Sequence, residues 1–339
     1  MFGKKKEETF SDKLIKKATN SKMRLFLPES TDPRILEAAA VAAQNDICTV
    51  VLAGSVKQFD EVFPAKILKK LQFLDMSDKN LRAKYASKIL EIRAAKGMTA
   101  DEAAEIVKRP MYFACAALVC GDIDGVVAGA ITETADVLRP AFQIVKTAKD
   151  VGIASSSMIF EGDKSFGENG ILVFGDIAVN PNPTSEQLCD IAIATAKTAK
   201  DVAGISPKVA LLSYSTKAEG KVSNEVQKVK DAFLLVRRKQ PSLVVDGEIQ
   251  VDAAVVPSVA KQKAPYGNLK GQANVLVFPN LDAGNIGYKI AARFGKMKAF
   301  GPIVQGLALP VNDLSRGASA DEIVGVLAIT ALQAKQAKK

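Results

Sequence analysis

The feature that most restricts the fold of this chain is a repeated alternation of short apolar strands with helical segments. Residues 23–27 form the first predicted strand, which Pro28 ends, and residues 30–43 contain a turn followed by helical periodicity. Residues 48–52 form the next predicted strand. Because alternation of this kind builds βαβ units around a parallel sheet, the sequence predicts an α/β fold.

The same pattern continues along the chain. Helices are expected over residues 78–95, after Thr99, from Pro110 and after Thr184. Further strands are expected at residues 71–74, 126–128, 151–160, 171–179, 209–212, 243–245, 275–278 and 301–309. The segment between 151–160 and 171–179 is hairpin-like, and residues 1–20 are typical of a charged amphipathic helix on the surface.

The region from Gly301 to Glu322 combines the features of an anion-binding loop. An apolar run ends at Pro310, polar side chains crowd residues 312–316, and Ser319 with Glu322 has the spacing of a capping box for the last helix. Free N–H groups at a helix start favour negative charge, and Arg316 can hold two phosphate oxygens at once. On spacing alone, an ordinary strand-to-helix turn with a solvated arginine is the alternative.

A second block with the same organisation follows the predicted strand at residues 126–128. Gly129 allows close approach of the backbone, and Thr132 with Thr134 is expected to cap the next helix. Since ligands of open α/β sheets bind beyond the carboxyl ends of the strands, both blocks are candidates for one site.

The absence of histidine excludes several kinds of active site within this chain. Ser-His-Asp triads, Cys-His pairs and His-ligated zinc all require a residue that the 339 positions do not contain. A general base must then be a carboxylate, lysine, tyrosine or thiol. No metal-ligand cluster and no dinucleotide-binding glycine motif after the first strand is visible, so neither a metal nor NAD is expected.

Charge and cysteine content limit the partners and the compartment. The net charge of +9 is dispersed and aromatic residues make up only 6%, which favours a small polyanionic substrate over nucleic acid. No apolar run could cross a membrane, and residues 1–10 lack the apolar stretch of a secretory signal, so the protein is expected to be cytoplasmic. The four cysteines are interpreted as structural free thiols.

Long ordered blocks of the sequence resemble the phosphate acetyltransferases (phosphotransacetylases) of the phosphate acetyl/butyryltransferase family. They begin at Arg24 with RLFLPESTDPRILEAA and end with PVNDLSRG at residues 310–317, and they cover nearly the whole chain. The resemblance implies two three-layer α/β domains with an interdomain cleft, isocitrate/isopropylmalate dehydrogenase-like, and a homodimer. Domain one would comprise residues 1–149 plus 308–339, and domain two residues 150–307.

The implied reaction is the reversible transfer of acetyl between acetyl-CoA and phosphate, without a covalent acyl-enzyme. The catalytic residues carried over from the family are Ser315, Arg316 and a base at Glu322 or Asp321. The residues for phosphate and acetyl phosphate are Arg93, Arg139, Thr132 and Thr134. The residues for coenzyme A are Ser213, Thr216, Asn280, Gly284, Asn285 and Asn312. Coenzyme A is a substrate here and no bound cofactor is expected; acetate kinase is the implied pathway partner, in acetate and acetyl-CoA metabolism.

Four positions depart from the family pattern. Arg109 stands where an acid is usual, Glu133 where a threonine is usual, Ile131 where histidine or asparagine is common, and Glu322 where an aspartate is usual. Glu133 is expected to point away from the phosphate, and Glu322 and Asp321 could also serve only as helix caps. The departures at Glu322 and Arg109 keep a regulatory module open as an alternative, like the phosphotransacetylase-like domain of some malic enzymes. A phosphate butyryltransferase is the other alternative.

Overall fold

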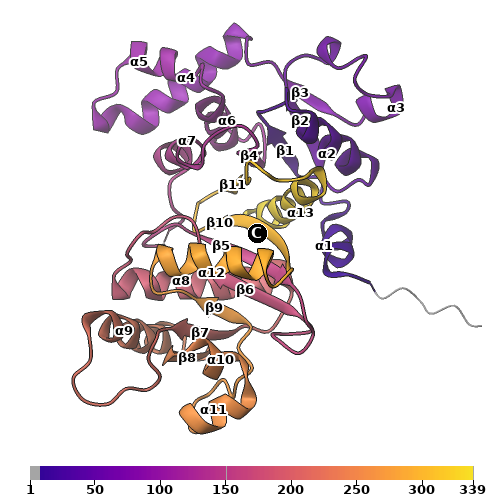
Figure 1. The fold of residues 1–339 in the computed structure, drawn as a ribbon. Helices are drawn as coiled ribbons and strands as arrows, with labels where there is room; N and C mark the ends of the chain where they lie inside the picture. Colours follow the sequence, from indigo (N-terminus) through magenta and orange to yellow (C-terminus); the bar gives the residue numbers. More distant parts are fainter. Residues whose placement is uncertain (1–7, 150, 339) are drawn as a thin grey trace, which may run out of the picture. The chain divides into compact units, whose positions relative to one another are not determined.

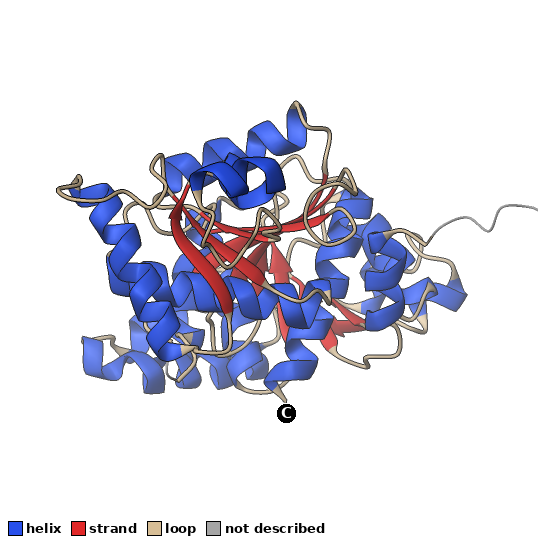
Figure 2. Cartoon of the chain, turned by 90° about the horizontal axis from the view of Figure 1, so that it is seen from below, coloured by secondary structure: helices blue, strands red, loops and turns tan. Residues whose placement is uncertain are grey.

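The computed structural model describes residues 8–149 and 151–338, so the first part of the expected N-terminal helix lies outside the described residues. The chain forms two compact units. Unit 1 comprises Met1–Lys146 and Leu307–Lys339, and unit 2 comprises Thr147–Gly306. In each unit the strands lie inside and the helices outside (Figures 1 and 2), which confirms the predicted α/β class.

The sheet of unit 1 has five strands, all parallel, in the order β11-β4-β1-β2-β3. Their bounds are β1 (Arg24–Leu27), β2 (Thr49–Ala53), β3 (Gln72–Leu74), β4 (Gly125–Ala128) and β11 (Val311–Asp313). From β1 the chain proceeds to β2 and β3 on one side and then returns to β4 on the other side. The strand order therefore reverses between β1 and β4, and this is the place where open α/β sheets bind ligands.

The helices of unit 1 cover this sheet. Their bounds are α1 (Phe10–Ala18), α2 (Pro33–Gln44), α3 (Ala65–Leu68), α4 (Lys79–Arg93), α5 (Ala100–Ile106), α6 (Pro110–Val119), α7 (Thr134–Pro140) and α13 (Ala320–Ala337). Helix α6 is almost wholly buried, and Phe113 packs edge-on against Tyr85 of α4. The C-terminal helix α13 packs against α1 and α2 at the other end of the chain (Figure 1).

The sheet of unit 2 has six strands in the order β10-β5-β6-β9-β7-β8. Their bounds are β5 (Ser155–Glu161), β6 (Ile171–Gly175), β7 (Lys208–Leu212), β8 (Val244–Ile249), β9 (Val275–Val277) and β10 (Lys298–Gln305). Strands β6, β9, β7 and β8 are parallel, whereas β5 is antiparallel to both of its neighbours, β6 and β10. The predicted hairpin at residues 161–170, which joins β5 to β6, is therefore confirmed. The helices are α8 (Ser185–Thr198), α9 (Asn224–Lys239), α10 (Val251–Val255), α11 (Pro257–Lys263) and α12 (Leu281–Arg293).

The predicted strand at residues 301–309 was wrong in its extent. Strand β10 ends at Gln305 in unit 2, and the strand that leads into the polar loop is β11, in unit 1. Gly306 takes a left-handed φ of +85° between them. The apolar run therefore serves two sheets, with the glycine redirecting the chain from one to the other.

Candidate active site

The candidate site of unit 1 lies at the carboxyl ends of three adjacent strands. Because β11, β4 and β1 are neighbouring parallel strands, the loops that follow them emerge at the same edge of the sheet. These loops carry Glu29, residues 129–133 and residues 314–319. Both blocks singled out from the sequence are thus brought together beside the switch point.

The loop after β4 already holds an anion, which is a side chain of the protein. The buried carboxylate of Glu29 accepts hydrogen bonds from the backbone N–H groups of Gly129, Ala130, Ile131 and Thr132, at 2.9, 2.8, 3.3 and 2.9 Å. Successive N–H groups of this kind form an anion-binding concavity. Gly129 after the strand indicated a close backbone approach here, but Glu29 was not among the predicted residues. Its only signal in the sequence is an acid directly after the strand-ending Pro28.

The predicted cap of α7 by Thr132 and Thr134 was wrong. The N-cap is Glu133, which makes no side-chain capping bond. The hydroxyl of Thr134 instead donates to Asp313 Oδ2 over 2.6 Å. The hydroxyl thus donates to a tertiary acceptor on β11, whereas the capping pattern assumed that it accepts from a backbone N–H group of its own helix.

Asp313 is a buried carboxyl group at the end of β11, and only one of its two oxygens has a hydrogen-bond partner among the described side chains. It is only 4% exposed, and its Oδ1 has no hydrogen-bond partner among the described residues. The pKa of Asp313 is raised to about 6, mainly by burial and to a smaller extent by the nearby Glu29, while the bonds from Thr134 and Leu314 and the charge of Arg316 act in the opposite direction. A Cβ atom at Gly129 would lie 2.3 Å from Oδ1, so this position requires glycine.

Arg34 connects the three loops, although the sequence analysis did not identify it. Its Nη1 donates to the carbonyl oxygens of Arg316 (2.7 Å) and Ala318 (3.0 Å). Its Nη2 donates to the carbonyl oxygen of Ala130 (2.9 Å) and to Asp32, and Nε also donates to Asp32. All five N–H groups of the guanidinium are therefore used, which fixes the loops in one arrangement.

The catalytic candidates Ser315 and Arg316 are exposed on the loop after β11. The Nη1 atom of Arg316 lies 3.7 Å from Glu133 Oε1, and both side chains are about 70% exposed. The expectation was that Glu133 points away from the phosphate site. Its carboxylate lies instead beside Arg316, a predicted phosphate ligand, because the two opposite charges attract each other. An exposed ion pair of this kind is weak, so it leaves Arg316 accessible to an anionic ligand.

The capping box predicted for the last helix is confirmed. Ser319 Oγ accepts from the N–H of Glu322 (3.3 Å), and Glu322 Oε2 accepts from the N–H of Ser319 (2.7 Å). The other base candidate, Asp321, is exposed in the same turn, and its carboxylate forms no hydrogen bond with another described residue. To act as a base, the carboxylate of Glu322 would first have to give up its hydrogen bond from Ser319. The carboxylate of Asp321 has no such bond.

Arg139 lies on α7 and Arg109 lies close to it, whereas Arg93 lines a cavity together with Arg109. Asp136 Oδ1 lies 3.6 Å from Arg139 and 3.5 Å from Arg109, so the two cations share one carboxylate. Arg109 and Arg93 line a cavity of about 480 Å³. The Nε atom of Arg93 is buried without a hydrogen-bond partner in the described chain. Arg109, which stands at the position of the usual acid, therefore shares a cavity with Arg93 and a carboxylate with Arg139.

Asn312 differs from the other coenzyme A candidates because it is fully buried in unit 1. Its Nδ2 donates to Thr330 Oγ1 (2.8 Å) and Gln333 Oε1 (2.6 Å), both on α13. These bonds join β11 to the last helix. The side chain therefore fixes the start of the loop that bears Ser315.

The other coenzyme A candidates lie in unit 2, at the ends of the neighbouring strands β7 and β9. Asn280 caps α12 by accepting from the N–H of Ala283 (2.9 Å), and Asn285 donates to the carbonyl oxygen of Ile177 (3.1 Å). A Cβ atom at Gly284 would lie 2.1 Å from the carbonyl oxygen of Asp176. Ser213 Oγ accepts from the N–H of Ser215 (3.2 Å), and Thr216 Oγ1 accepts from that of Gln250 (2.9 Å). Each of these residues thus already has a structural partner.

The cysteines and the acidic residues show no other catalytic centre. All four cysteines are free thiols, and burial raises the pKa of each, so none is poised as a thiolate. Within residues 8–149 and 151–338, no group of three His, Cys, Asp or Glu side chains could hold a metal ion. No helix in the same ranges is long and apolar enough to cross a membrane.

Comparison with known proteins agrees with the resemblance in the sequence. A family model described as "Phosphate acetyl/butaryl transferase" matches residues 9–331. A phosphate acetyltransferase of Thermoanaerobacterium thermosaccharolyticum is 46% identical over 95% of this chain and 98% of its own length. A phosphotransacetylase structure from Streptococcus pyogenes superimposes with a TM-score of 0.89 at 36% identity, covering 98% of this chain and 100% of the other.

A more distant structure bears on the fold alone. A putative 4-hydroxythreonine-4-phosphate dehydrogenase from Salmonella typhimurium shares 13% identity with a TM-score of 0.50, over 91% of this chain and 99% of the other. The expected dehydrogenase-like architecture is thereby confirmed.

Proposed function

Because this chain belongs to the phosphate acetyl/butyryltransferase family, its activity is phosphate acetyl transfer, and we propose that the acetyl group passes directly between coenzyme A and phosphate at the loops of unit 1. The observation that carries this proposal is the shared edge of β11 and β4, which brings the Ser315–Arg316 loop and the arginine-bearing helix α7 together. We also propose that units 1 and 2 are the two domains expected from the sequence.

In the proposed reaction, an oxygen of phosphate attacks the carbonyl carbon of the thioester. The tetrahedral oxyanion then collapses, the carbon–sulfur bond breaks, and coenzyme A leaves as a thiolate that takes up a proton. Arg316, Arg139 and Arg93 would bind the phosphate and the developing charge, since guanidinium groups stay charged and hold oxygens in pairs. The hydroxyl of Thr132 is available to the phosphate, whereas that of Thr134 is committed to Asp313.

Proton transfer at the sulfur would involve Ser315 and a carboxylate of α13. Ser315 Oγ accepts one long hydrogen bond, from the N–H of Gly317 at 3.4 Å, so its own proton can be donated to the sulfur. In the reverse direction, in which the thiol of coenzyme A gives up its proton and attacks acetyl phosphate, Glu322 would have to leave the capping box to act as the base. Asp321 has no such bond to release. We therefore favour Asp321 over Glu322.

Coenzyme A would be held by unit 2. The proposed residues Ser213, Thr216, Asn280 and Asn285 lie at the carboxyl ends of β7 and β9, where ligands of α/β sheets bind. Gly284 keeps α12 close to Asp176 and so positions Asn280 and Asn285. Asn312, which is buried, would act by holding the loop of Ser315 and not by touching the ligand.

We further propose a homodimer that buries one face of α12. Ile286, Ile290 and Phe294 are 58, 50 and 84% exposed, and their spacing of four residues aligns them on one side of the helix. A row of exposed apolar side chains of this kind is typical of an interaction surface. The free cysteines agree with a reducing, cytoplasmic compartment, where acetate kinase would use or supply acetyl phosphate.

The test is phosphate-dependent release of coenzyme A thiol from acetyl-CoA, with butyryl-CoA assayed alongside. We expect rapid turnover of acetyl-CoA that Arg316→Ala reduces by about 10²-fold or more. A preference for butyryl-CoA would place the protein with the butyryltransferases. Ligand binding without turnover of either substrate would contradict the proposal and leave a regulatory module.

A further inference from the structure

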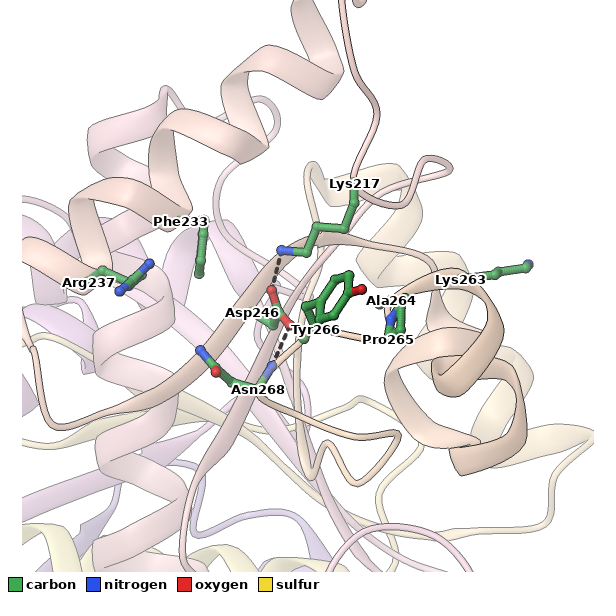
Figure 3. Close-up of a pocket in the computed structure, with 10 residues that line it drawn as sticks. Lys217, Phe233, Arg237, Asp246, Lys263, Ala264, Pro265, Tyr266 and Asn268 are labelled. Carbon is green, nitrogen blue, oxygen red and sulfur yellow. Dashed lines mark hydrogen bonds and ion pairs between the residues drawn. The ribbon is translucent and has the colours of Figure 1, made fainter.

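Unit 2 contains a cavity of about 450 Å³ beside β8, the edge strand of its sheet. Its walls come from α9, from the loop after β7 and from the segment that follows α11 (Figure 3). The residues that matter for its chemistry are Lys217, Phe233, Arg237, Asp246, Tyr266 and Asn268. None of them has a role in the reaction as described above.

The floor of this cavity is a buried carboxylate whose charge is compensated. Asp246 is 2% exposed and forms an ion pair with Lys217. It also accepts from the backbone N–H groups of Gly247 (2.9 Å) and Asn268 (3.0 Å). The cavity therefore does not repel an anion, although an acid lies at its base.

The walls are held in a fixed arrangement. A Cβ atom at Gly267 would lie 2.5 Å from Asp246 Oδ2, so only glycine lets the segment after α11 approach β8 so closely. Lys217 adopts a left-handed φ of +50°, and its Nζ also donates to the carbonyl oxygen of Gly247 over 2.7 Å. A non-glycine residue in this conformation is uncommon and is often found at binding sites.

The open side of the cavity presents cations and aromatic rings. The guanidinium of Arg237 lies 5.8 Å from the ring centre of Phe233 and forms no ion pair with any described residue. Lys217 Nζ lies 4.7 Å from the same ring centre. Tyr266 is 96% exposed and stands in front of Asp246 (Figure 3). Tyr266 and Arg237 lie on opposite sides of Asp246 (Figure 3), so the exposed ring and the guanidinium without an ion pair offer two separate contacts to one ligand.

We propose that this cavity binds a nucleotide, with the base against Tyr266 and a phosphate at Arg237 and the side-chain amide of Asn268. Stacking on exposed aromatic rings combined with basic side chains is a general mode of nucleotide recognition. The volume lies in the range of small-molecule sites, about 300–1,000 Å³. The nucleotide is either a free effector or the nucleotide end of coenzyme A, and this second source rests on the proposed function.

The test is titration calorimetry of the full-length protein with ADP. Arg237→Gln and Tyr266→Leu are the variants, and Arg238→Gln, which removes the neighbouring exposed charge of α9, is the matched control. We expect saturable binding that each cavity variant weakens by about tenfold and the control leaves unchanged. Absence of saturable binding, or equal binding by all four proteins, would overturn the proposal.

The source of the nucleotide is decided by repeating the titration with saturating coenzyme A. A free effector predicts that ADP still binds and that Arg237→Gln leaves the KM for coenzyme A unchanged. The nucleotide end of coenzyme A predicts that ADP binding is lost and that the variant raises this KM by about the same tenfold. Turnover by the wild-type protein is measured separately, so a failure of the proposed function is distinguishable from a failure of this site.

Discussion

The hydroxyl of Thr134 donates a 2.6 Å hydrogen bond to the buried carboxyl group of Asp313, two residues before Ser315. This bond joins the first residue of α7 to the end of β11. The other carboxyl oxygen, Oδ1, has no partner among the described residues. The pKa of Asp313 is raised to about 6, mainly by burial, while from the adjoining loops Glu29 raises it and Arg316 lowers it. An acid with a shifted pKa therefore lies next to the loop of Ser315.

Stability should fall as the pH rises through the pKa of Asp313. Burial raises this pKa from 3.8 to about 6, so between these values the folded protein binds more protons than the unfolded chain. The contribution is fully present below about pH 4 and is lost above about pH 6, and it amounts to about 3 kcal/mol. Denaturant unfolding of the wild type and of Asp313→Asn at pH 4.5 and 7.5 measures it.

The variant Asp313→Asn should gain free energy of unfolding relative to the wild type as the pH increases, because its amide does not ionise. Thr134→Val is a useful second variant, since it removes the bond that favours the ionised carboxyl group. It should move the transition to higher pH. The same pH dependence in the wild type and in Asp313→Asn would show that another group is responsible.

Replacement of Arg34 should reduce catalysis more than it reduces substrate binding by unit 2. In Arg34→Lys the charge remains, but a single ammonium group cannot reach Asp32, Ala130 and the two carbonyl oxygens of residues 316 and 318 at once. A loop displaced by about 1 Å can cost about 10²-fold in rate. We therefore expect kcat to fall by about that factor with a small change in the KM for coenzyme A.

The control for Arg34→Lys is Arg238→Lys, at an exposed position of α9. It should retain the activity and melting temperature of the wild type. Wild-type kcat in Arg34→Lys would mean that the loops keep their arrangement without the guanidinium.

The contrast between Ser319 and Arg34 explains how far the site could be predicted from the sequence. The capping partner of Ser319 is three residues away, so spacing alone was sufficient. Arg34 contacts Arg316 across 282 positions, and Glu29 contacts Gly129 across 100. Contacts of this length depend on the strand order β11-β4-β1, which local periodicity does not specify. For the same reason the sequence predicts a helix cap at Thr134, although its hydroxyl donates to Asp313 on β11, 179 positions away.

Gly284→Ala should destabilise unit 2, although alanine is the better helix former. The added Cβ would lie 2.1 Å from the carbonyl oxygen of Asp176, which a rigid backbone cannot avoid. We expect a loss of about 1–3 kcal/mol in the free energy of unfolding. Gly287→Ala on the same helix is the control, since its nearest neighbour is the ring of Phe278 at 3.0 Å, and it should be less affected. Equal losses in both variants would mean that the helix tolerates the added atom by shifting.

The identity of the base can be decided by comparing Asp321→Asn with Glu322→Gln. Glutamine at residue 322 can still accept from the N–H of Ser319, so the capping box is retained and only the charge is removed. Asparagine at residue 321 removes the carboxylate that has no bond to release. If Asp321 is the base, its variant should lose about 10²-fold or more in kcat, while Glu322→Gln stays within about threefold of the wild type.

The melting temperature of both variants serves as the control. Neither variant removes a capping bond, and each removes one negative charge from the first turn of α13, so both should lower the melting temperature slightly and to a similar extent. A large loss of kcat in Glu322→Gln at the melting temperature of Asp321→Asn would reverse the assignment. It would mean that the capping box opens during turnover and that Glu322 moves to the thiol of coenzyme A. Full activity in both variants would show that the thiol loses its proton to water or to the bound phosphate, with the carboxylates serving only the helix.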